Sequence, residues 1–145
     1  LPEALAWEAR WGQPFSIYRP IFAAAAEAGL PVAALNLPAE VVRRVGAEGE
    51  AALPPEIPAL IPPPPEQEPM LRRAFEAHGR GGAAAWDRFV RVQSLWDTAM
   101  AVAARTWSRR LDRPVIVLAG AGHVANGWGI AHRLRHLDPG AGVVP

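Results

Sequence analysis

Apolar residues recur at helical spacing in the first part of the chain. Between residues 14 and 29, the aromatic side chains lie three or four positions apart, at Phe15, Tyr18 and Phe22. This spacing predicts a helix with a proline in its first turn. Pro20 interrupts the pattern, so we expect a kink or a restart just after it. Gly29 is placed like a C-terminal cap.

Three further helices are predicted, over residues 38–45, 66–78 and 83–109. The longest carries a broad apolar face that includes Trp86, Phe89, Val90, Trp96, Met100 and Trp107. A polar pair, Gln93 and Asp97, lies one helical turn apart within this face. The proline-rich residues 54–65 indicate an extended surface linker between two helices, with a ligand for an SH3-like domain as the alternative.

Two short, continuously apolar runs predict buried strands, at residues 32–35 and 114–119. A short basic helix follows over 130–137, and residues 142–144 resemble the start of another strand. Because sheets usually contain about four to six strands, we expect an α/β domain with a parallel sheet flanked by helices, of which residues 1–145 form the C-terminal part. The missing strands are then expected upstream of Leu1, in an N-terminally truncated domain.

Composition limits the classes of partner. The 145 residues carry a net charge of +1, and the arginines are spread along the chain without a basic patch, which argues against nucleic acid as a partner. The absence of cysteine excludes disulfides and cysteine metal sites. No apolar run approaches the roughly 20 residues that cross a bilayer, and no signal peptide is visible.

Asn36 and His123 each follow one of the predicted strands. Ligand sites of open α/β sheets lie at that edge, which makes both residues candidates for binding. The alternative for Asn36 is a turn or a helix cap, and for His123 a buried imidazole satisfied by backbone carbonyls. The glycines that flank His123 favour a binding loop, but their order is not that of a phosphate loop.

Gln93 and Asp97 are the next candidates. A carboxylate within an apolar face needs a partner, which is either an arginine from a neighbouring helix or a ligand-holding group such as His123. Tyr18, the only tyrosine, is either a core residue or a phenolate ligand for iron. His132 and His136 have metal-compatible spacing but lie beside arginines, and no nucleophile elbow or paired catalytic carboxylates appear. The residues alone therefore make no strong case for an enzyme.

Four blocks of the sequence carry a family resemblance. They are WGQPFSIYRPIF at 11–22, GLPVAALN at 29–36, FVRVQSLWDTAM at 89–100 and VLAGAGHVANGWGI at 117–130. In this order they resemble the ChaN family of haem-binding, iron-regulated lipoproteins, part of a superfamily with Tiki-like and erythromycin-esterase-like proteins. The resemblance implies one α/β domain over residues 1–145, with a helical excursion at 38–108.

The resemblance also implies a function. The resemblance implies a bacterial cell-envelope protein, either periplasmic or attached to the outer membrane by a lipid anchor that is not present in this chain. Such a protein is expected to bind haem for iron uptake and to form a homodimer. Tyrosine is the haem ligand associated with the family, but Asn126 and Trp128 stand in the loop where it is expected. His123 then remains as an iron ligand, Trp128 as a residue that stacks on the porphyrin, and Tyr18 as a substitute ligand.

Arginines are expected to bind the haem propionates, with Arg19, Arg43 and Arg133 as candidates. Two alternatives stay open. One is a metal-dependent hydrolase with His123 as base or metal ligand, supported by Asn36 and Asp97. The other is an interaction module without a ligand.

Overall fold

The computed structural model describes residues 2–3, 6–78 and 81–145. Over these ranges the chain consists of helices and irregular segments, without a β-strand. It divides into two compact units, Leu1–Ala34 and Leu35–Pro145, which are described separately here. None of the described helices combines the length and the apolar character that a membrane crossing requires.

The first unit is a pair of helices joined by an aromatic cluster. Helices α1 (Trp7–Trp11) and α2 (Phe15–Glu27) place four rings within 5.5 Å of the Trp7 ring, namely those of Trp11, Phe15, Tyr18 and Phe22. The helix does not end and restart after Pro20, because α2 continues through that residue. Rings on both sides of Pro20 pack on Trp7, and this packing offsets the backbone hydrogen bond that proline forfeits.

The predicted cap at Gly29 is confirmed. Gly29 has a φ of 63°, its N–H bonds to the Ala26 carbonyl at 3.1 Å, and the Leu30 N–H bonds to the Ala25 carbonyl at 2.8 Å. This pair of bonds is the Schellman arrangement, which needs a left-handed residue and therefore favours glycine.

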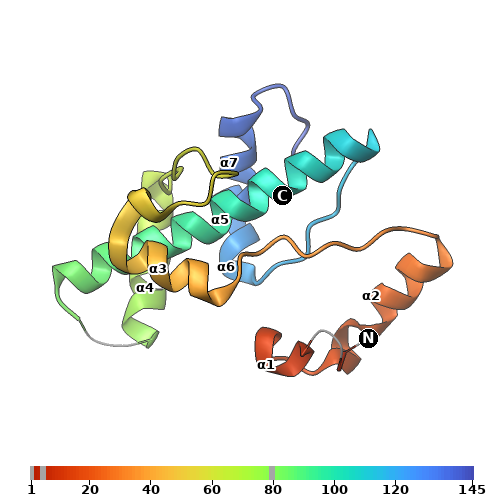
Figure 1. The fold of residues 1–145 in the computed structure, drawn as a ribbon, viewed down its shortest axis with the longest axis horizontal. Helices are drawn as coiled ribbons and strands as arrows, with labels where there is room; N and C mark the ends of the chain where they lie inside the picture. Colours follow the sequence, from red (N-terminus) through yellow and green to blue (C-terminus); the bar gives the residue numbers. More distant parts are fainter. Residues whose placement is uncertain (1, 4–5, 79–80) are drawn as a thin grey trace. The chain divides into compact units, whose positions relative to one another are not determined.

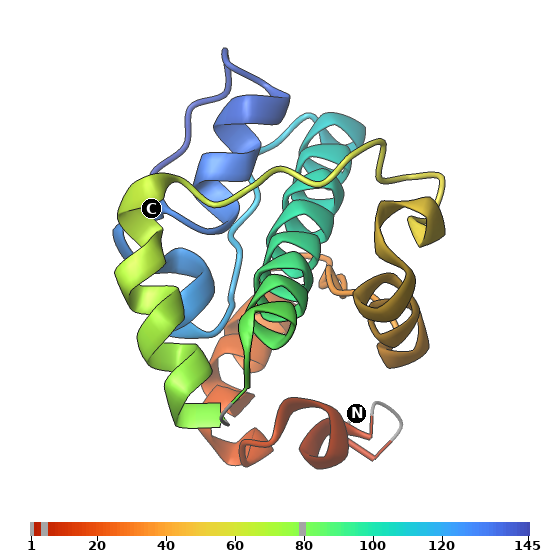
Figure 2. The same ribbon diagram turned by 90° about the vertical axis from the view of Figure 1, so that its left-hand side faces the viewer.

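In the second unit, the long helix α5 (Ala83–Leu111) packs against three other helices (Figure 1). These are α3 (Ala39–Glu48), α4 (Glu68–His78) and α7 (Ile130–Leu137). Figure 2 shows α3 and α4 on different sides of α5. Short turns complete the unit: η1 (Gly49–Ala52), η2 (Pro65–Gln67), α6 (Ala121–Val124) and η3 (Ala125–Gly127). All the helices predicted from sequence periodicity are present.

Helix α5 forms the core because one face buries two apolar clusters. Leu95 and Ala99 pack with Val42 and Val45 of α3, while Met100 and Ala101 pack with Ile130 of α7. Leu95, Val45 and Ala101 are fully buried. The apolar stripe of α5 therefore joins α3 to α7.

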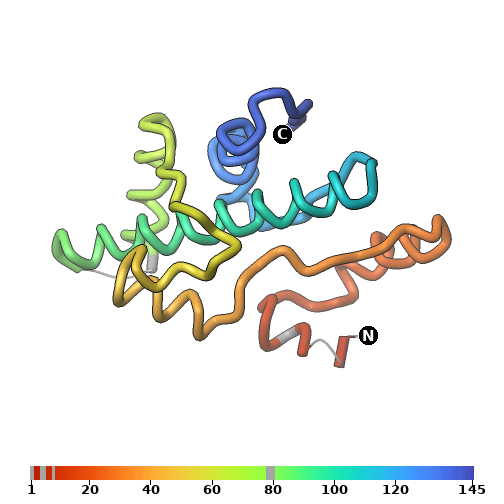
Figure 3. The backbone as a smooth tube through the Cα atoms, turned by 45° about the horizontal axis from the view of Figure 1, so that its top comes forward, coloured from red at the N-terminus to blue at the C-terminus, as the bar shows by residue number. Residues whose placement is uncertain are grey.

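The proline-rich segment is part of the core and not only a surface linker. It crosses α5 in extended form (Figure 3) and buries Ile57 and Ile61. The Ile61 N–H donates to the Thr98 hydroxyl of α5 at 3.2 Å. This bond matters because proline-rich backbone has few donors of its own.

The predicted parallel sheet flanked by helices is wrong. Residues 114–119 are extended, but no described residue forms a hydrogen bond with their backbone. Val117 and Ala119 pack against the cluster of α5 and α7, whereas Ile116 is 85% exposed on the other face. Residues 32–35 likewise form no backbone hydrogen bond with a described residue, and in residues 142–144 the Val143 carbonyl accepts one from the Arg135 side chain and not from another strand. Residues 114–119 are therefore covered by helices on one face only, whereas the sequence predicted a strand that is buried on both faces.

Candidate functional site

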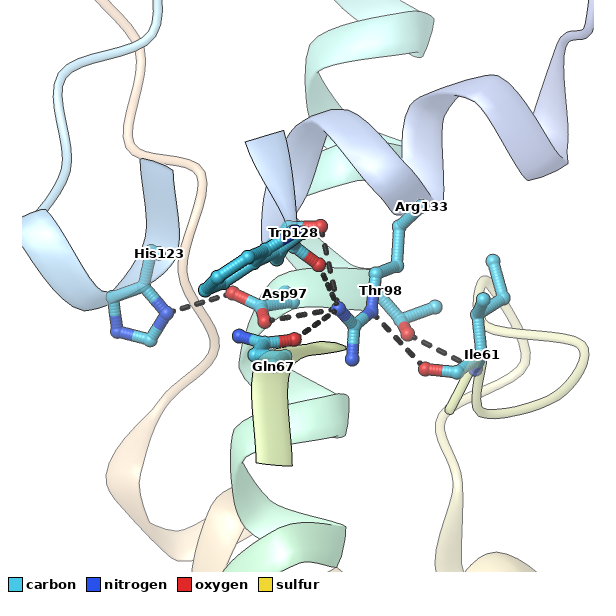
Figure 4. Close-up of polar contacts among 8 residues, drawn as sticks. Ile61, Gln67, Asp97, Thr98, His123, Trp128 and Arg133 are labelled. Atoms are coloured by element: carbon cyan, nitrogen blue, oxygen red, sulfur yellow. Dashed lines mark hydrogen bonds and ion pairs between the residues drawn. The ribbon is translucent and has the colours of Figure 1, made fainter. Parts of the chain in front are cut away.

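The candidate site is built around a histidine–carboxylate pair. His123 of α6 and Asp97 of α5 lie 26 residues apart in sequence, and the His123 Nδ1 approaches the Asp97 Oδ1 to 2.7 Å (Figure 4). Asp97 is 1% exposed, while the His123 side chain is 23% exposed. Asp97 therefore holds one ring nitrogen from the interior, and the imidazole reaches the surface.

Glycines determine how the loop after residue 119 reaches this position. Gly120 precedes α6, and its carbonyl accepts the His123 N–H at 2.9 Å. Gly129 packs directly on the His123 backbone, so that a β-carbon at residue 129 would collide with the His123 carbonyl. Only glycine allows this approach.

Arg133 of α7 anchors the carboxylate from the opposite side. Its Nη1 lies 3.5 Å from the Asp97 Oδ2, and both side chains are 1% exposed. The same guanidinium donates to the Ile61 carbonyl at 3.1 Å, the Gln67 Oε1 at 3.1 Å and the Trp128 carbonyl at 2.6 Å (Figure 4). It therefore links the proline-rich segment, α5 and α7 at one buried point.

The burial of Arg133 has electrostatic effects on α7. Desolvation lowers the pKa of Arg133, and the neighbouring Asp97 opposes that shift. The pKa of His132 is also lowered, first by partial burial and then by the positive charges of Arg133, His136 and Arg135. These positive charges disfavour the binding of a metal cation by His132 and His136.

The second nitrogen of His123, Nε2, has no hydrogen-bond partner in the parts of the chain that the structure describes. The ring of Trp96 meets the imidazole edge-on, with centroids 6.0 Å apart and planes at 88°. Because Nδ1 is held by a carboxylate, the neutral ring carries its proton there and leaves the Nε2 lone pair free. Such a nitrogen can bind a metal or accept a proton.

The other predicted residues of the second unit do not join this pair. Asn36 is exposed, and its Oδ1 accepts the N–H of the next residue, Leu37, at 2.8 Å. Gln93 is half-buried and has no hydrogen bond to His123. Asn126 is exposed and adopts a left-handed conformation with φ of 54°. Trp128 contributes its backbone carbonyl to Arg133. Tyr18 belongs to the aromatic cluster of the first unit.

Sequence reasoning missed the residues that support the pair. Arg133 had been assigned to propionates, and Gln67 and Thr98 had not been selected. The spacing of Arg133 gives a signal, because it lies three positions after Ile130 on the apolar face of α7. A charged residue on such a face needs a buried partner. For Asp97, the two expected partners, an arginine and His123, are both present.

Two features fall outside this site. An open pocket of about 170 Å³ lies between the proline-rich segment, α4 and α5, lined by Pro63, Pro64, Pro65, Glu68, Leu71, Trp86 and Val90. It does not include His123. Within the described ranges, no three histidine, aspartate or glutamate side chains lie close enough together to hold a metal ion.

Residues 1–134 match a family model described as haem-binding uptake, Tiki superfamily, ChaN. No curated protein and no solved structure matches the chain.

Proposed function

The chain belongs to the ChaN family of haem-binding uptake proteins in the Tiki superfamily, and on this premise we propose that it binds haem with His123 as the axial ligand. The observation that carries the proposal is the pairing of the His123 Nδ1 with the buried carboxylate of Asp97 at 2.7 Å. Metal-binding histidines almost always donate their other ring N–H to a carboxylate, a carbonyl or water, which fixes the ring and its tautomer.

The residues present fit this group. The Nε2 is free, the side chain is 23% exposed, and the Trp96 ring provides an apolar surface beside the imidazole. Histidine is a common axial ligand of haem iron. Haem, when bound, supplies an iron centre with oxidation–reduction chemistry, while the protein holds the imidazole and its tautomer.

Arg133 is excluded as a propionate ligand. It is 1% exposed, and its guanidinium already contacts Asp97, Gln67 and backbone carbonyls. In the second unit, Arg43 is exposed on α3 and remains a candidate for the propionates.

The family description, which names uptake, supports a finer proposal. We propose that the protein acts in haem or iron acquisition at the bacterial cell envelope. A haem carrier needs a ligand that reaches the surface, because the haem has to pass between proteins. The partial exposure of His123 meets that requirement.

The test is a titration of the chain with haemin, followed at the Soret band, with His123→Ala alongside. We expect saturable binding and a shifted band, both of which the substitution abolishes. His136→Ala is the matched control, because His136 is an exposed histidine on α7 outside the pair. Equal affinity and an unchanged spectrum in His123→Ala would exclude His123 as the ligand, and the titration would be repeated with Tyr18→Phe.

A hydrolytic function is the second candidate, because an imidazole oriented by a buried carboxylate is also the geometry of a general base. In this case the Nε2 of His123 removes a proton from water or binds a catalytic metal. Metal analysis of the purified chain and assays with activated esters separate the two functions. Stoichiometric zinc, manganese or cobalt together with ester hydrolysis lost in His123→Ala supports the enzyme.

A further inference from the structure

The carboxylate of Asp97 lies closer to His123 than to Arg133. The carboxylate is 1% exposed, so water does not screen it. Its Oδ1 lies 2.7 Å from the His123 Nδ1, whereas its Oδ2 lies 3.5 Å from the Arg133 Nη1. The nearer contact, and the one at the length of a short hydrogen bond, is therefore the one to the imidazole.

Arg133 approaches the carboxylate less closely than it approaches its other acceptors. Its Nη1 also contacts the Trp128 carbonyl at 2.6 Å and the Gln67 Oε1 at 3.1 Å, both shorter than its distance to Asp97. The guanidinium thus divides its donors among several acceptors and fixes the Asp97 side chain without forming a short bond to it. The imidazole remains the closest partner of the carboxylate.

A histidine ligand that donates its other ring N–H to a carboxylate becomes more basic. Greater electron donation favours the more positively charged oxidation state of a bound iron, and hydrogen bonding of this kind is one of the means by which proteins adjust haem. Resting on the proposed haem function, we propose that Asp97 is a positioning residue that makes the chain selective for ferric over ferrous haem.

The experiment compares the two oxidation states on the same protein. The affinities for haemin and for dithionite-reduced haem are measured without oxygen, for the unaltered chain and for Asp97→Asn. Asparagine keeps the shape and an oxygen acceptor for Nδ1–H but removes the charge. We expect the ratio of ferric to ferrous affinity to fall about tenfold in Asp97→Asn, since losing such a hydrogen-bond partner typically costs about 10–100-fold in metal affinity and ferric iron loses more of it than ferrous iron.

The midpoint potential of the bound haem gives an independent readout. A tenfold fall in the ratio raises the potential by about 59 mV for this one-electron couple. A purely structural role of Asp97 would weaken both affinities together and leave the potential unchanged. Gln93→Leu is the matched control, because Gln93 lies one turn away on α5 without a hydrogen bond to His123.

The outcomes separate the two proposals. If neither form of haem binds the unaltered chain, the proposed haem function fails. If both forms bind and Asp97→Asn leaves their ratio and the potential unchanged, the haem function stands and the role of Asp97 is wrong. If Asp97→Asn does not fold, the unaltered chain decides: its potential must lie below that of haem with free imidazole in the same buffer, and an equal or higher potential overturns the inference.

Discussion

Arg133→Met removes the buried guanidinium while keeping much of its apolar stem. Asp97 then loses its cation and keeps His123 alone. The Ile61 carbonyl, the Gln67 Oε1 and the Trp128 carbonyl lose a donor at 3.1, 3.1 and 2.6 Å respectively. The substitution therefore leaves a buried charge uncompensated and several buried acceptors unsatisfied.

Breaking a buried ion pair by removing one partner costs about 3–5 kcal/mol of unfolding free energy. Each buried acceptor left alone costs about 1–3 kcal/mol in isolation, but methionine allows relaxation and these terms do not add. We therefore expect a loss of about 3–5 kcal/mol. At roughly 2–4 °C per kcal/mol for a chain of this size, the melting temperature falls by about 6–20 °C.

Urea unfolding followed by far-ultraviolet circular dichroism measures the change. Arg135→Met is the matched control, since Arg135 is exposed on the same helix and makes one hydrogen bond, to the Val143 carbonyl. That variant should lose no more than about 1 kcal/mol. The Asp97→Asn/Arg133→Met double variant should be more stable than the sum of the single losses by about 0.5–3 kcal/mol. Equal losses in Arg133→Met and Arg135→Met, or strict additivity, would refute the buried pair.

Three further outcomes are expected. Gly129→Ala should lose about 1–3 kcal/mol of stability by overpacking and should weaken haem binding, because the new β-carbon displaces the His123 carbonyl. Gly122→Ala is the control: a β-carbon at residue 122 meets nothing within 4 Å, so stability and haem binding should both stay unchanged. The pKa of His132 is lowered from 6.5 in the folded chain. As the pH drops below 6.5, the unfolded chain therefore binds more protons than the folded chain, and the free energy of unfolding falls. The fall in melting temperature between neutral and acidic pH should therefore be smaller in His132→Asn. Ile116→Ala should change the free energy of unfolding by no more than about 0.5 kcal/mol, whereas a cost of several kcal/mol would indicate a side chain that is covered.

Helical periodicity was a reliable guide to this chain. The face of α5 was predicted from the spacing of its apolar residues, and α7 has the predicted bounds of 130–137. His123 and Asp97 were both selected as candidates, one from a glycine-rich loop and one from its place on an apolar face. The sequence did not predict their contact uniquely, because the two residues are 26 positions apart and meet only through the packing of α5 and α6.

The strand prediction failed for a physical reason. A short apolar run shows that side chains are buried, but it does not show what buries them. In residues 114–119 alternate side chains pack on α5 and α7, and the remaining ones are exposed, as at Ile116. For the proline-rich segment the sequence predicted too little burial. Its composition indicated a surface linker, but Ile57 and Ile61 are buried.

The Arg133 contacts also determine the order in which the site is completed during folding. Ile61 and Arg133 lie 72 positions apart, so their hydrogen bond closes one of the longest loops in the chain. Helices such as α5 form from local contacts, whereas this bond requires that the proline-rich segment and α7 have both docked. We expect it to be absent from the folding transition state, with a φ-value near zero. Loss of the guanidinium should then accelerate unfolding and leave the folding rate almost unchanged, and the imidazole should be held in its binding geometry only once the chain is fully folded.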